Sequence, residues 1–148
     1  MVLQSPAFTA GAEIPAVYTC DGSDTAPPLS WSGVPAKTKS LVLVVDDPDA
    51  PGGTWVHWVV YNLPPAARNL PPGGALPKGS LQGSNGWRKA AYGGPCPPSG
   101  RHRYSHRLYA LDTVLPDLHG PTKATLEQAM EGHVLAQAEL VGTYQRTR

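Results

Sequence analysis

Charged residues are scarce in this sequence, and their scarcity excludes several classes of partner. Of its 148 residues only 16% are charged, well below the usual share of about a quarter, and the formal net charge is +1. So neutral a chain has no electrostatic attraction for nucleic acid or an anionic membrane surface, and we expect neither as a partner. The sequence also lacks an apolar run of about 18 residues and a basic, apolar stretch at its start. We therefore expect no transmembrane segment, no export signal and a cytoplasmic location.

Cysteine is scarce too, with only Cys20 and Cys96 in the chain. Two cysteines neither require nor exclude a disulfide. Because disulfides are rare in reducing compartments, we expect Cys96, which lies among prolines, to be an inert buried thiol in a cytoplasmic protein.

Glycine and proline, in contrast, are abundant, with 16 and 17 residues spread along the chain. Mixed with 41% hydrophobic residues, they are typical of turns and loops in an ordered β-rich domain. The length and the lack of a repeat or a linker predict one domain over residues 1–148. Only the segment from Thr122 to about Gly132 has helical periodicity, with Thr122 or Thr125 as its N-cap, and its end could instead lie near Ala136. Many short strands and one helix favour an antiparallel sandwich or barrel.

Two strands on either side of an acidic loop are the clearest elements. Leu41–Val45 is a β-branched run that predicts a buried strand, and we expect it to end at Asp46. The loop from Asp46 to Gly53 carries three aspartates and two prolines, which make it stiff. Residues 55–61 resume a strand. The period of two places four of its residues on one face: Trp55, His57, Val59 and Tyr61.

The remaining sequence predicts shorter strands joined by long connections. Strands are expected at residues 2–4, near residue 18, and over residues 27–31, 102–111 and 139–144. On the strand over residues 102–111, alternation places the even-numbered residues on one face and the odd-numbered residues on the other. Residues 64–86 show no periodicity and predict a surface loop with at most one short strand.

Two rigid loops, each beside a strand that carries a histidine, form the candidate site. The acidic loop accompanies His57, and a second Gly/Pro-rich loop that begins with Gly93 and Gly94 precedes His102. If the two strands are neighbours, Asp47 converges with both histidines. Two imidazoles can carry positive charge near neutral pH, and a neighbouring carboxylate fixes the tautomer of a histidine and raises its pKa.

Other groups would complete such a pocket. Backbone N–H groups of the turn at Gly93 and Gly94 could complete an anion cavity, with Trp55 and Tyr104 as its walls. A cavity of this kind suits a phosphate monoester, or a phospholipid head group that offers an amine to the aspartate. The expected partner is therefore a small phosphorylated ligand or a phospholipid head group.

Each candidate also has an ordinary structural interpretation. A strand histidine is more often structural than a ligand, Asp47 could cap its own turn, and Asp49 could do the same or pair with Arg103. Two histidines and a carboxylate are also the ligand types of a metal triad, and Asp–His pairs serve as general bases. No H-x-x-x-H or G-x-S-x-G pattern supports an enzyme. We therefore expect no catalytic residue, no metal and no cofactor.

Paired motifs in this chain resemble a known family. The sequence Asp-Pro-Asp-Ala-Pro at residues 47–51, the Trp-Val-His at 55–57, and Gly-Gly-Pro-Cys-Pro-Pro at 93–98 ahead of His-Arg-Tyr at 102–104 are similar to the phosphatidylethanolamine-binding protein family. Mammalian members of that family include the Raf kinase inhibitor protein. The segments Tyr18–Gly22 and 132–144 resemble its compact bacterial and archaeal branch. The resemblance covers nearly the whole chain.

The resemblance implies a mainly β protein, a Greek-key antiparallel β-sandwich with one or two short helices and an anion pocket at one end. Residues matching that pocket, together with the glycine turn, are the expected ligand-binding set: Asp47, Trp55, His57, Gly94, Cys96, His102 and Tyr104. Cys96 stands where animal members usually have glycine, so a thiol could line the pocket. The C-terminal helix of the mammalian proteins has no counterpart in this sequence.

The family resemblance also implies a function. We expect non-catalytic binding of a phospholipid head group, a phosphorylated small molecule or a phosphorylated side chain, by a protein that forms a homodimer. The alternative is an inhibitor or interaction protein that acts on a protease or kinase through the surface loop over residues 64–86. The third hypothesis is an enzyme, either metal-dependent or hydrolytic.

Overall fold

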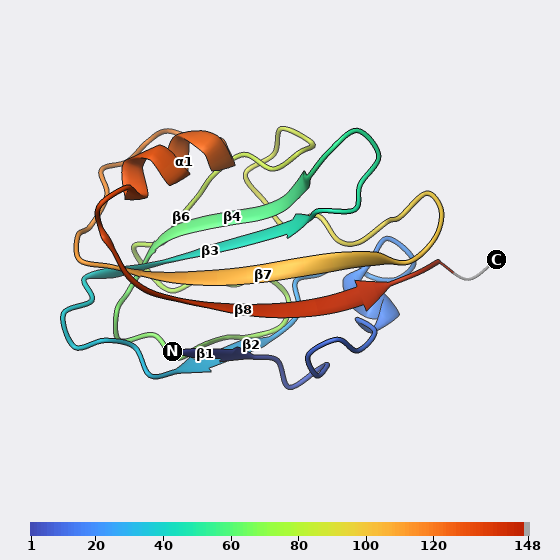
Figure 1. Ribbon diagram of the computed structural model, residues 1–148, viewed down its shortest axis with the longest axis horizontal. Helices are drawn as coiled ribbons and strands as arrows, with labels where there is room; N and C mark the ends of the chain where they lie inside the picture. Colours follow the sequence, from blue (N-terminus) through green and yellow to red (C-terminus); the bar gives the residue numbers. More distant parts are fainter. Residues whose placement is uncertain (147–148) are drawn as a thin grey trace.

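Two antiparallel β-sheets face each other across a shared core in the computed structural model, which describes residues 1–146 (Figure 1). The larger sheet contains, in spatial order, β6 (Leu81–Gln82), β4 (Trp55–Leu63), β3 (Ser40–Asp47), β7 (His102–Leu111) and β8 (Val134–Tyr144). The smaller sheet contains β1 (Val2–Gln4), β2 (Leu29–Ser32) and β5 (Asn69–Leu70). The antiparallel β-sandwich expected from the sequence is confirmed.

The main core fills the space between the two sheets. Leu41, Leu43 and Val45 point into it from β3, and Tyr104 and Leu108 point into it from β7. The small sheet contributes its own buried side chains: Leu3, Leu29, Trp31 and Leu70. These residues follow the period of two, so the predicted faces of β7 are confirmed.

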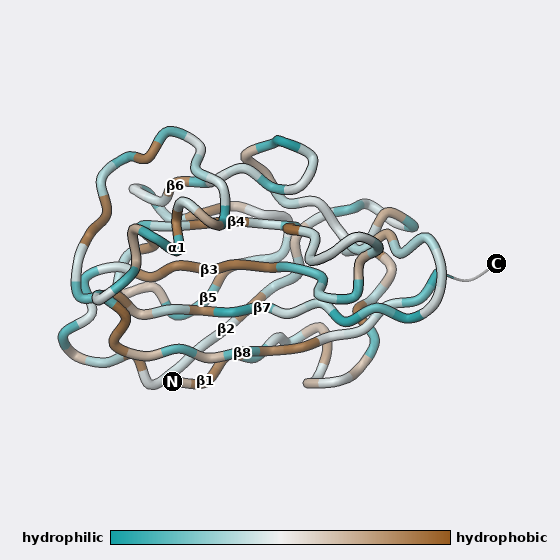
Figure 2. Tube along the Cα trace, turned by 45° about the horizontal axis from the view of Figure 1, so that its top comes forward, coloured by the Kyte–Doolittle hydropathy of each residue, from teal (hydrophilic) through white to brown (hydrophobic). Residues whose placement is uncertain are grey.

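A second core covers the outer face of the large sheet. The helix α1 (Lys123–Met130) packs Leu126 and Met130 against Val42 and Val44 of β3. Because β3 is buried on both faces, its sequence is a continuous apolar run, which Figure 2 shows along the middle of the sheet. The side chain of Thr122 accepts a hydrogen bond from the Thr125 N–H, which confirms it as the N-cap.

Several predicted boundaries are wrong. The region near Tyr18 forms the short 3-10 helix η1 (Ala16–Tyr18) rather than a strand, because its N–H donates to the carbonyl of Pro15. β3 continues through Asp46 and Asp47, which pair with β4, and ends only where Pro48 lacks a donor. Residues 64–86 contain two short strands, β5 and β6, instead of one at most. The helix ends at Met130, so the alternative end near residue 136 is excluded.

Asp46 ties three elements together beneath the site. Its carboxylate is only 2% exposed and accepts hydrogen bonds from Arg107 on β7 and from Lys123 on α1, the latter at 2.7 Å. A buried carboxylate is tolerated only when it is paired in this way. The pair of cations therefore fixes the end of β3, which carries Asp47.

None of the helices in the described residues has the length and apolar composition that a membrane span requires.

The buried histidine of β7 predicts a loss of stability in mild acid. His106 is 1% exposed, its Nδ1 faces the backbone carbonyls of Tyr104 and Leu140, and burial lowers its pKa from 6.5 to about 4. The unfolded chain takes up this proton below about pH 6.5, whereas the folded protein takes it up only near pH 4. The contribution of His106 to the free energy of unfolding should therefore be fully present above about pH 6.5. The free energy of unfolding should fall by about 3 kcal/mol as the pH approaches 4.

Urea titrations at a series of pH values measure this loss. His106→Leu should flatten the pH profile in that window, while His119→Leu, a change at an exposed site, should leave it unchanged. Equal slopes for wild type and His106→Leu would show that the ring is not held neutral by burial.

Candidate functional site

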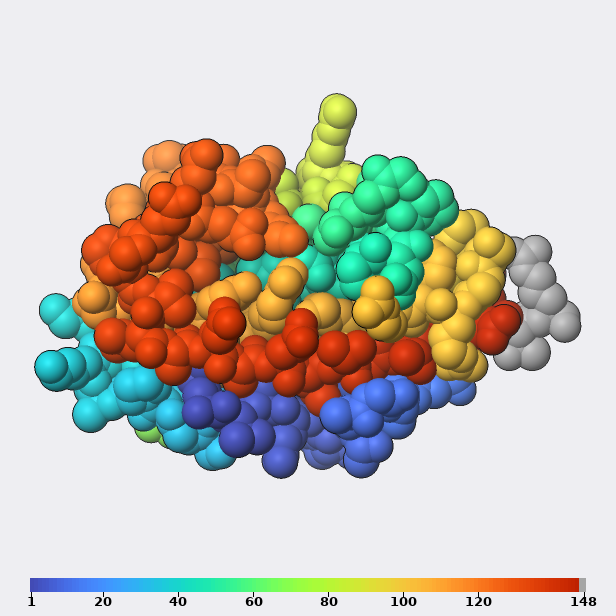
Figure 3. Space-filling model, in the orientation of Figure 1, coloured from blue at the N-terminus to red at the C-terminus, as the bar shows by residue number. Residues whose placement is uncertain are grey.

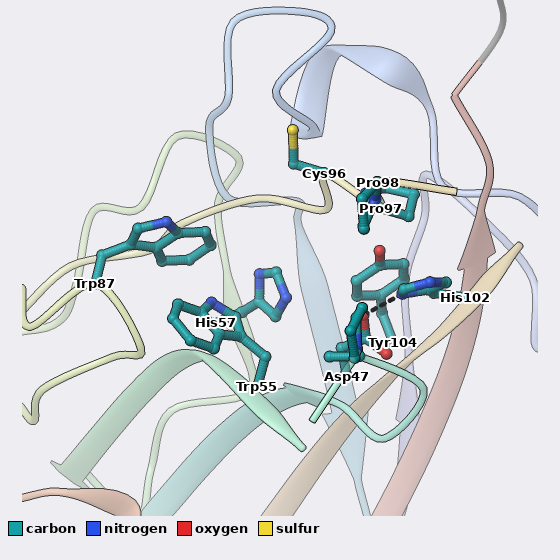
Figure 4. Close-up of a pocket in the computed structure, with 11 residues that line it drawn as sticks. Asp47, Trp55, His57, Trp87, Cys96, Pro97, Pro98, His102 and Tyr104 are labelled. Atoms are coloured by element: carbon teal, nitrogen blue, oxygen red, sulfur yellow. Dashed lines mark hydrogen bonds and ion pairs between the residues drawn. The ribbon is translucent and has the colours of Figure 1, made fainter. Parts of the chain in front are cut away.

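The two rigid loops lie side by side at one end of the sandwich. The loop between β3 and β4 and the Gly/Pro loop before β7 meet at the right of Figures 1 and 3. Between them is an open cavity of about 230 Å³ (Figure 4). Its lining contains both loops and parts of β4 and β7: Asp47, Ala50, Pro51, Trp55, His57, Trp87, Cys96, Pro97, Pro98, His102 and Tyr104.

A β-bulge points His57 into this cavity. Val45 pairs with Trp58, but the next residue of β3, Asp46, pairs with Val56, so His57 is an extra residue in the ladder. Its ring contacts Tyr104 of the main core, on the same side as Trp58, whereas Val56 packs with the helix-side cluster. The predicted common face of His57 with Val59 and Tyr61 is therefore wrong, because the period of two fails at the bulge.

Asp47 and His102 form a buried pair on one wall. Nδ1 of His102 lies 2.6 Å from Oδ2 of Asp47, and its Nε2 lies 3.1 Å from the carbonyl oxygen of Ser99. Both side chains are nearly buried, with 5% and 8% exposed. A carbonyl and a carboxylate can only accept, so both ring nitrogens of His102 face acceptors of the protein itself. The pair thus forms a polar wall of the cavity that is held in place by the protein.

The acidic loop is held in place by its own carboxylates. The second oxygen of Asp47 accepts the N–H of Asp49 at 2.7 Å, which is a local turn. Asp49 in turn accepts from the Arg103 backbone N–H at 2.9 Å and from its guanidinium at 2.8 Å and 2.9 Å. These hydrogen bonds lower the pKa of Asp49 to about 2. The predicted pairing of Asp49 with Arg103 is confirmed, and it ties the loop to β7.

His57 occupies the opposite wall between two aromatic rings. Its ring centroid lies 5.2 Å from Trp87 and 5.3 Å from Tyr104, both edge to face. Nδ1 lies 2.7 Å from the carbonyl oxygen of Gly93, and burial lowers the pKa of the ring. The ring is therefore a neutral imidazole that donates from Nδ1 to the second loop.

The hydroxyl of Tyr104 is the one buried phenol on the cavity wall. Tyr104 is 1% exposed, and its hydroxyl meets the distance and angle limits of a hydrogen bond with no described residue, although it interacts with the Asp47 carboxylate beside it. Burial, followed by the charge of Asp47, raises its pKa, so it remains a protonated donor. A buried hydroxyl without a partner costs free energy, and at a cavity wall it is placed to bond a ligand.

The structure brings six of the seven expected residues to the cavity lining, and the seventh, Gly94, lines a neighbouring hollow. Its N–H donates to Oδ1 of Asp24 at 2.8 Å, and the N–H of Gly93 donates to the His57 carbonyl at 3.0 Å. Both backbone donors are thus used within the protein. The expectation that this glycine turn offers N–H groups to an anion is wrong, because the turn is anchored instead.

The expected free thiol is also absent, because Cys96 forms a disulfide with Cys20. The two Cα atoms lie 5.4 Å apart, and the bridge joins the Gly/Pro loop to the turn after η1. Cys96 is exposed, and its sulfur points away from His57 and Tyr104 (Figure 4). The expectations of an inert buried thiol and of a thiol-lined pocket are therefore both wrong.

Trp87 is a wall residue that sequence reasoning missed. It lines the cavity and packs edge to face against Trp55 at 5.4 Å, with 43% of its surface exposed. It belongs to the stretch that leads into the Gly/Pro loop, and a large aromatic residue there was the available signal. Within the part of the chain that the structure describes, no three His, Cys, Asp or Glu residues are grouped to hold a metal.

Comparison with known proteins agrees with this geometry. The sequence matches the family model described as phosphatidylethanolamine-binding protein over residues 4–145. The chain belongs to this family. It is 53% identical to a UPF0098 protein of Methanothermobacter thermautotrophicus, over 99% of both chains.

Solved structures of the family are similar throughout. A phosphatidylethanolamine-binding protein homolog from Chlamydia trachomatis is 48% identical, with a TM-score of 0.95 over 99% of this chain and 97% of that one. YbcL of Escherichia coli, described as a member of the mammalian family, is 34% identical, with a TM-score of 0.91 over 98% of both chains. The similarity therefore extends over the whole sandwich, including both loops of the site.

Proposed function

We propose that the protein binds phosphate-bearing ligands in this cavity without transforming them. The ligand class comprises a phospholipid head group, a phosphorylated small molecule and a phosphorylated side chain. The single observation that supports the proposal most is the buried Tyr104 hydroxyl, a donor without a well-formed hydrogen bond, on a ring that contacts both His57 and His102. An oxyanion satisfies this donor.

The lining also favours binding over catalysis. It contains no serine, threonine or free thiol among the described residues, so an activated nucleophile of those kinds is absent. Members of the family are named for binding phosphatidylethanolamine, whose head group joins a phosphate to an amine. The Asp47 carboxylate lines the same cavity and carries the negative charge that attracts such an amine, while its two oxygens also accept from His102 and the Asp49 N–H.

NMR titration with O-phosphorylethanolamine tests the proposal. The ring signals of His57 and His102 should move on addition of millimolar ligand, because both rings line the cavity. His133, which is half-buried outside the cavity and pairs with Asp112 at 2.7 Å, serves as a control in the same spectrum. Unmoved cavity signals, or equal movement of all three, would refute specific binding here.

Removing the unpartnered hydroxyl should separate binding from stability. Tyr104→Phe should weaken ligand binding about tenfold or more, since a hydrogen bond to a charged group contributes roughly 1.5 to 3 kcal/mol. The free energy of unfolding should stay the same or rise, because the unsatisfied hydroxyl disappears. Calorimetric titration and urea unfolding measure the two effects.

Tyr144→Phe is the matched control for that experiment. The Tyr144 hydroxyl already donates to Asp21 at 2.6 Å, and Tyr144 does not line the cavity. Its removal should lower stability by about 1 kcal/mol and leave ligand affinity unchanged. Tyr104→Phe with full affinity would contradict the proposed role of the hydroxyl.

The homodimer, the cytoplasmic location and inhibition of a protease or kinase through residues 64–86 stay predictions. Light scattering of the purified protein reports the oligomer.

Disulfides are rare in reducing compartments. The oxidised fraction of Cys20 and Cys96, trapped by alkylation in source cells, therefore reports the compartment. Exchange of residues 72–79, between β5 and β6, for a short Gly–Ser link should abolish capture of an inhibited partner.

A further inference from the structure

The hydrogen bonding of His57 determines what its other nitrogen can do. A carbonyl oxygen can only accept, so the 2.7 Å contact with the Gly93 carbonyl places a proton on Nδ1. A neutral ring carries one proton, which leaves Nε2 with a lone pair. Figure 4 shows the ring of His57 directed across the cavity toward Tyr104 and His102, on the side where a ligand would lie. His57 therefore presents an acceptor to the ligand.

The surroundings keep that acceptor neutral. His57 is only 4% exposed and lies between the rings of Trp87 and Tyr104, and burial is the main cause of its lowered pKa. The titratable and charged groups that surround it come from β3, β7 and the turn after η1: Asp46, Asp47, His102, Tyr104, His106 and Asp24. The three carboxylates favour a proton on the ring, but their effect is smaller than that of burial.

The cavity thus offers a mixed set of groups to an oxyanion. Tyr104 contributes a donor, whereas His57 contributes an acceptor that only an O–H or N–H can satisfy. An oxyanion whose oxygens all lack protons would direct a lone pair at Nε2. A singly protonated oxyanion satisfies donor and acceptor together.

We propose that the cavity binds its oxyanion in the singly protonated form, with the P–OH of hydrogen phosphate or of a phosphomonoester donating to Nε2 of His57. This inference rests on the proposed function and specifies the ligand that the function requires. It makes His57 a residue that selects phosphate over sulfate, because sulfate carries no proton at neutral pH. It also makes binding of a phosphomonoester strongest below its second pKa, which is about 6, because only the monoanion carries the P–OH.

Calorimetric titration with inorganic phosphate, methyl phosphate and sulfate tests the inference. Near pH 6 both phosphates should bind at least about fivefold more tightly than sulfate, since an unmet buried acceptor costs a factor of about 5 to 150. Methyl phosphate should lose about tenfold in affinity for each pH unit above its second pKa, as its monoanion disappears. Titration in two buffers of different ionisation enthalpy should show no proton uptake by the protein below that pKa.

His57→Phe keeps an aromatic ring between Trp87 and Tyr104 but removes the acceptor. In this variant phosphate and sulfate should bind almost equally, and the pH dependence of phosphate binding should nearly disappear. His133→Phe, at a half-buried site outside the cavity, should keep both. Nitrogen chemical shifts of His57 in the wild-type protein give a test that needs no variant, because they should report a proton on Nδ1 and none on Nε2.

The outcomes distinguish this inference from the proposed function on which it rests. Equal binding of sulfate and phosphate with proton uptake by His57 would overturn the inference and leave the anion pocket standing. A proton on Nε2 of the free protein would also overturn it. Absence of binding by all three anions would overturn both. Preference for the protonated phosphates, lost in His57→Phe, would establish both.

Discussion

Removing the disulfide between Cys20 and Cys96 should lower the free energy of unfolding by about 3 to 4 kcal/mol, or the Tm by roughly 10 °C. The bridge closes a loop across 76 positions of sequence, so it restricts the unfolded chain strongly. The double variant Cys20→Ser/Cys96→Ser should still fold. The Gly/Pro loop keeps the hydrogen bonds from the Cys20 N–H to the Pro95 carbonyl and from the Gly94 N–H to Asp24.

Ligand affinity should fall in the same variant, because residues 96–98 line the cavity and lose their covalent anchor. Thermal unfolding and phosphate titration measure both effects. Cys96 is exposed, so added reductant should bring the wild type to the stability of the variant and leave the variant unchanged. Wild-type stability that is insensitive to reductant would contradict the prediction.

Replacing Asp46, whose buried carboxylate lies beneath the site, should lower the free energy of unfolding about as much as removing the disulfide. Asp46→Asn keeps the volume of the side chain but leaves Arg107 and Lys123, which are 30% and 20% exposed, without their shared anion. Breaking a buried ion pair by removing one partner costs roughly 3 to 5 kcal/mol, and the partial exposure of the cations places this case near 3. Urea unfolding measures the loss.

Glu13→Gln is the matched control for Asp46→Asn. Glu13 pairs with Arg101 at 3.4 Å, and both side chains are about half exposed. An exposed pair contributes roughly 0 to 1 kcal/mol, so this variant should stay near wild-type stability. Equal losses for the two variants would show that burial does not set the energy of the Asp46 cluster.

Elements with regular periodicity were predictable from the sequence. The apolar run of β3 has to be covered on both faces, and the smaller sheet and α1 cover it. The alternation in β7 assigned its faces, and Thr122 identified the start of the helix. The convergence of Asp47 with His102 followed from the two loops, because each loop adjoins one of a pair of neighbouring strands.

Features that depend on pairing between distant segments were not predictable in this way. The bulge at His57 depends on how β4 aligns with β3, and a period of two assumes that every residue has one partner. The disulfide depends on two loops meeting in space, which composition cannot report. The N–H groups of Gly93 and Gly94 looked available in sequence, but they are anchored to His57 and Asp24.

The chain of hydrogen bonds from His102 through Asp47 and Asp49 to Arg103 has a kinetic consequence. Every carboxylate in it is already oriented by the protein, so a ligand orders few side chains on arrival. The entropy lost on binding then falls mainly on the ligand itself. Association should therefore be a single step at a rate set by encounter and orientation, without a slow phase from loop closure.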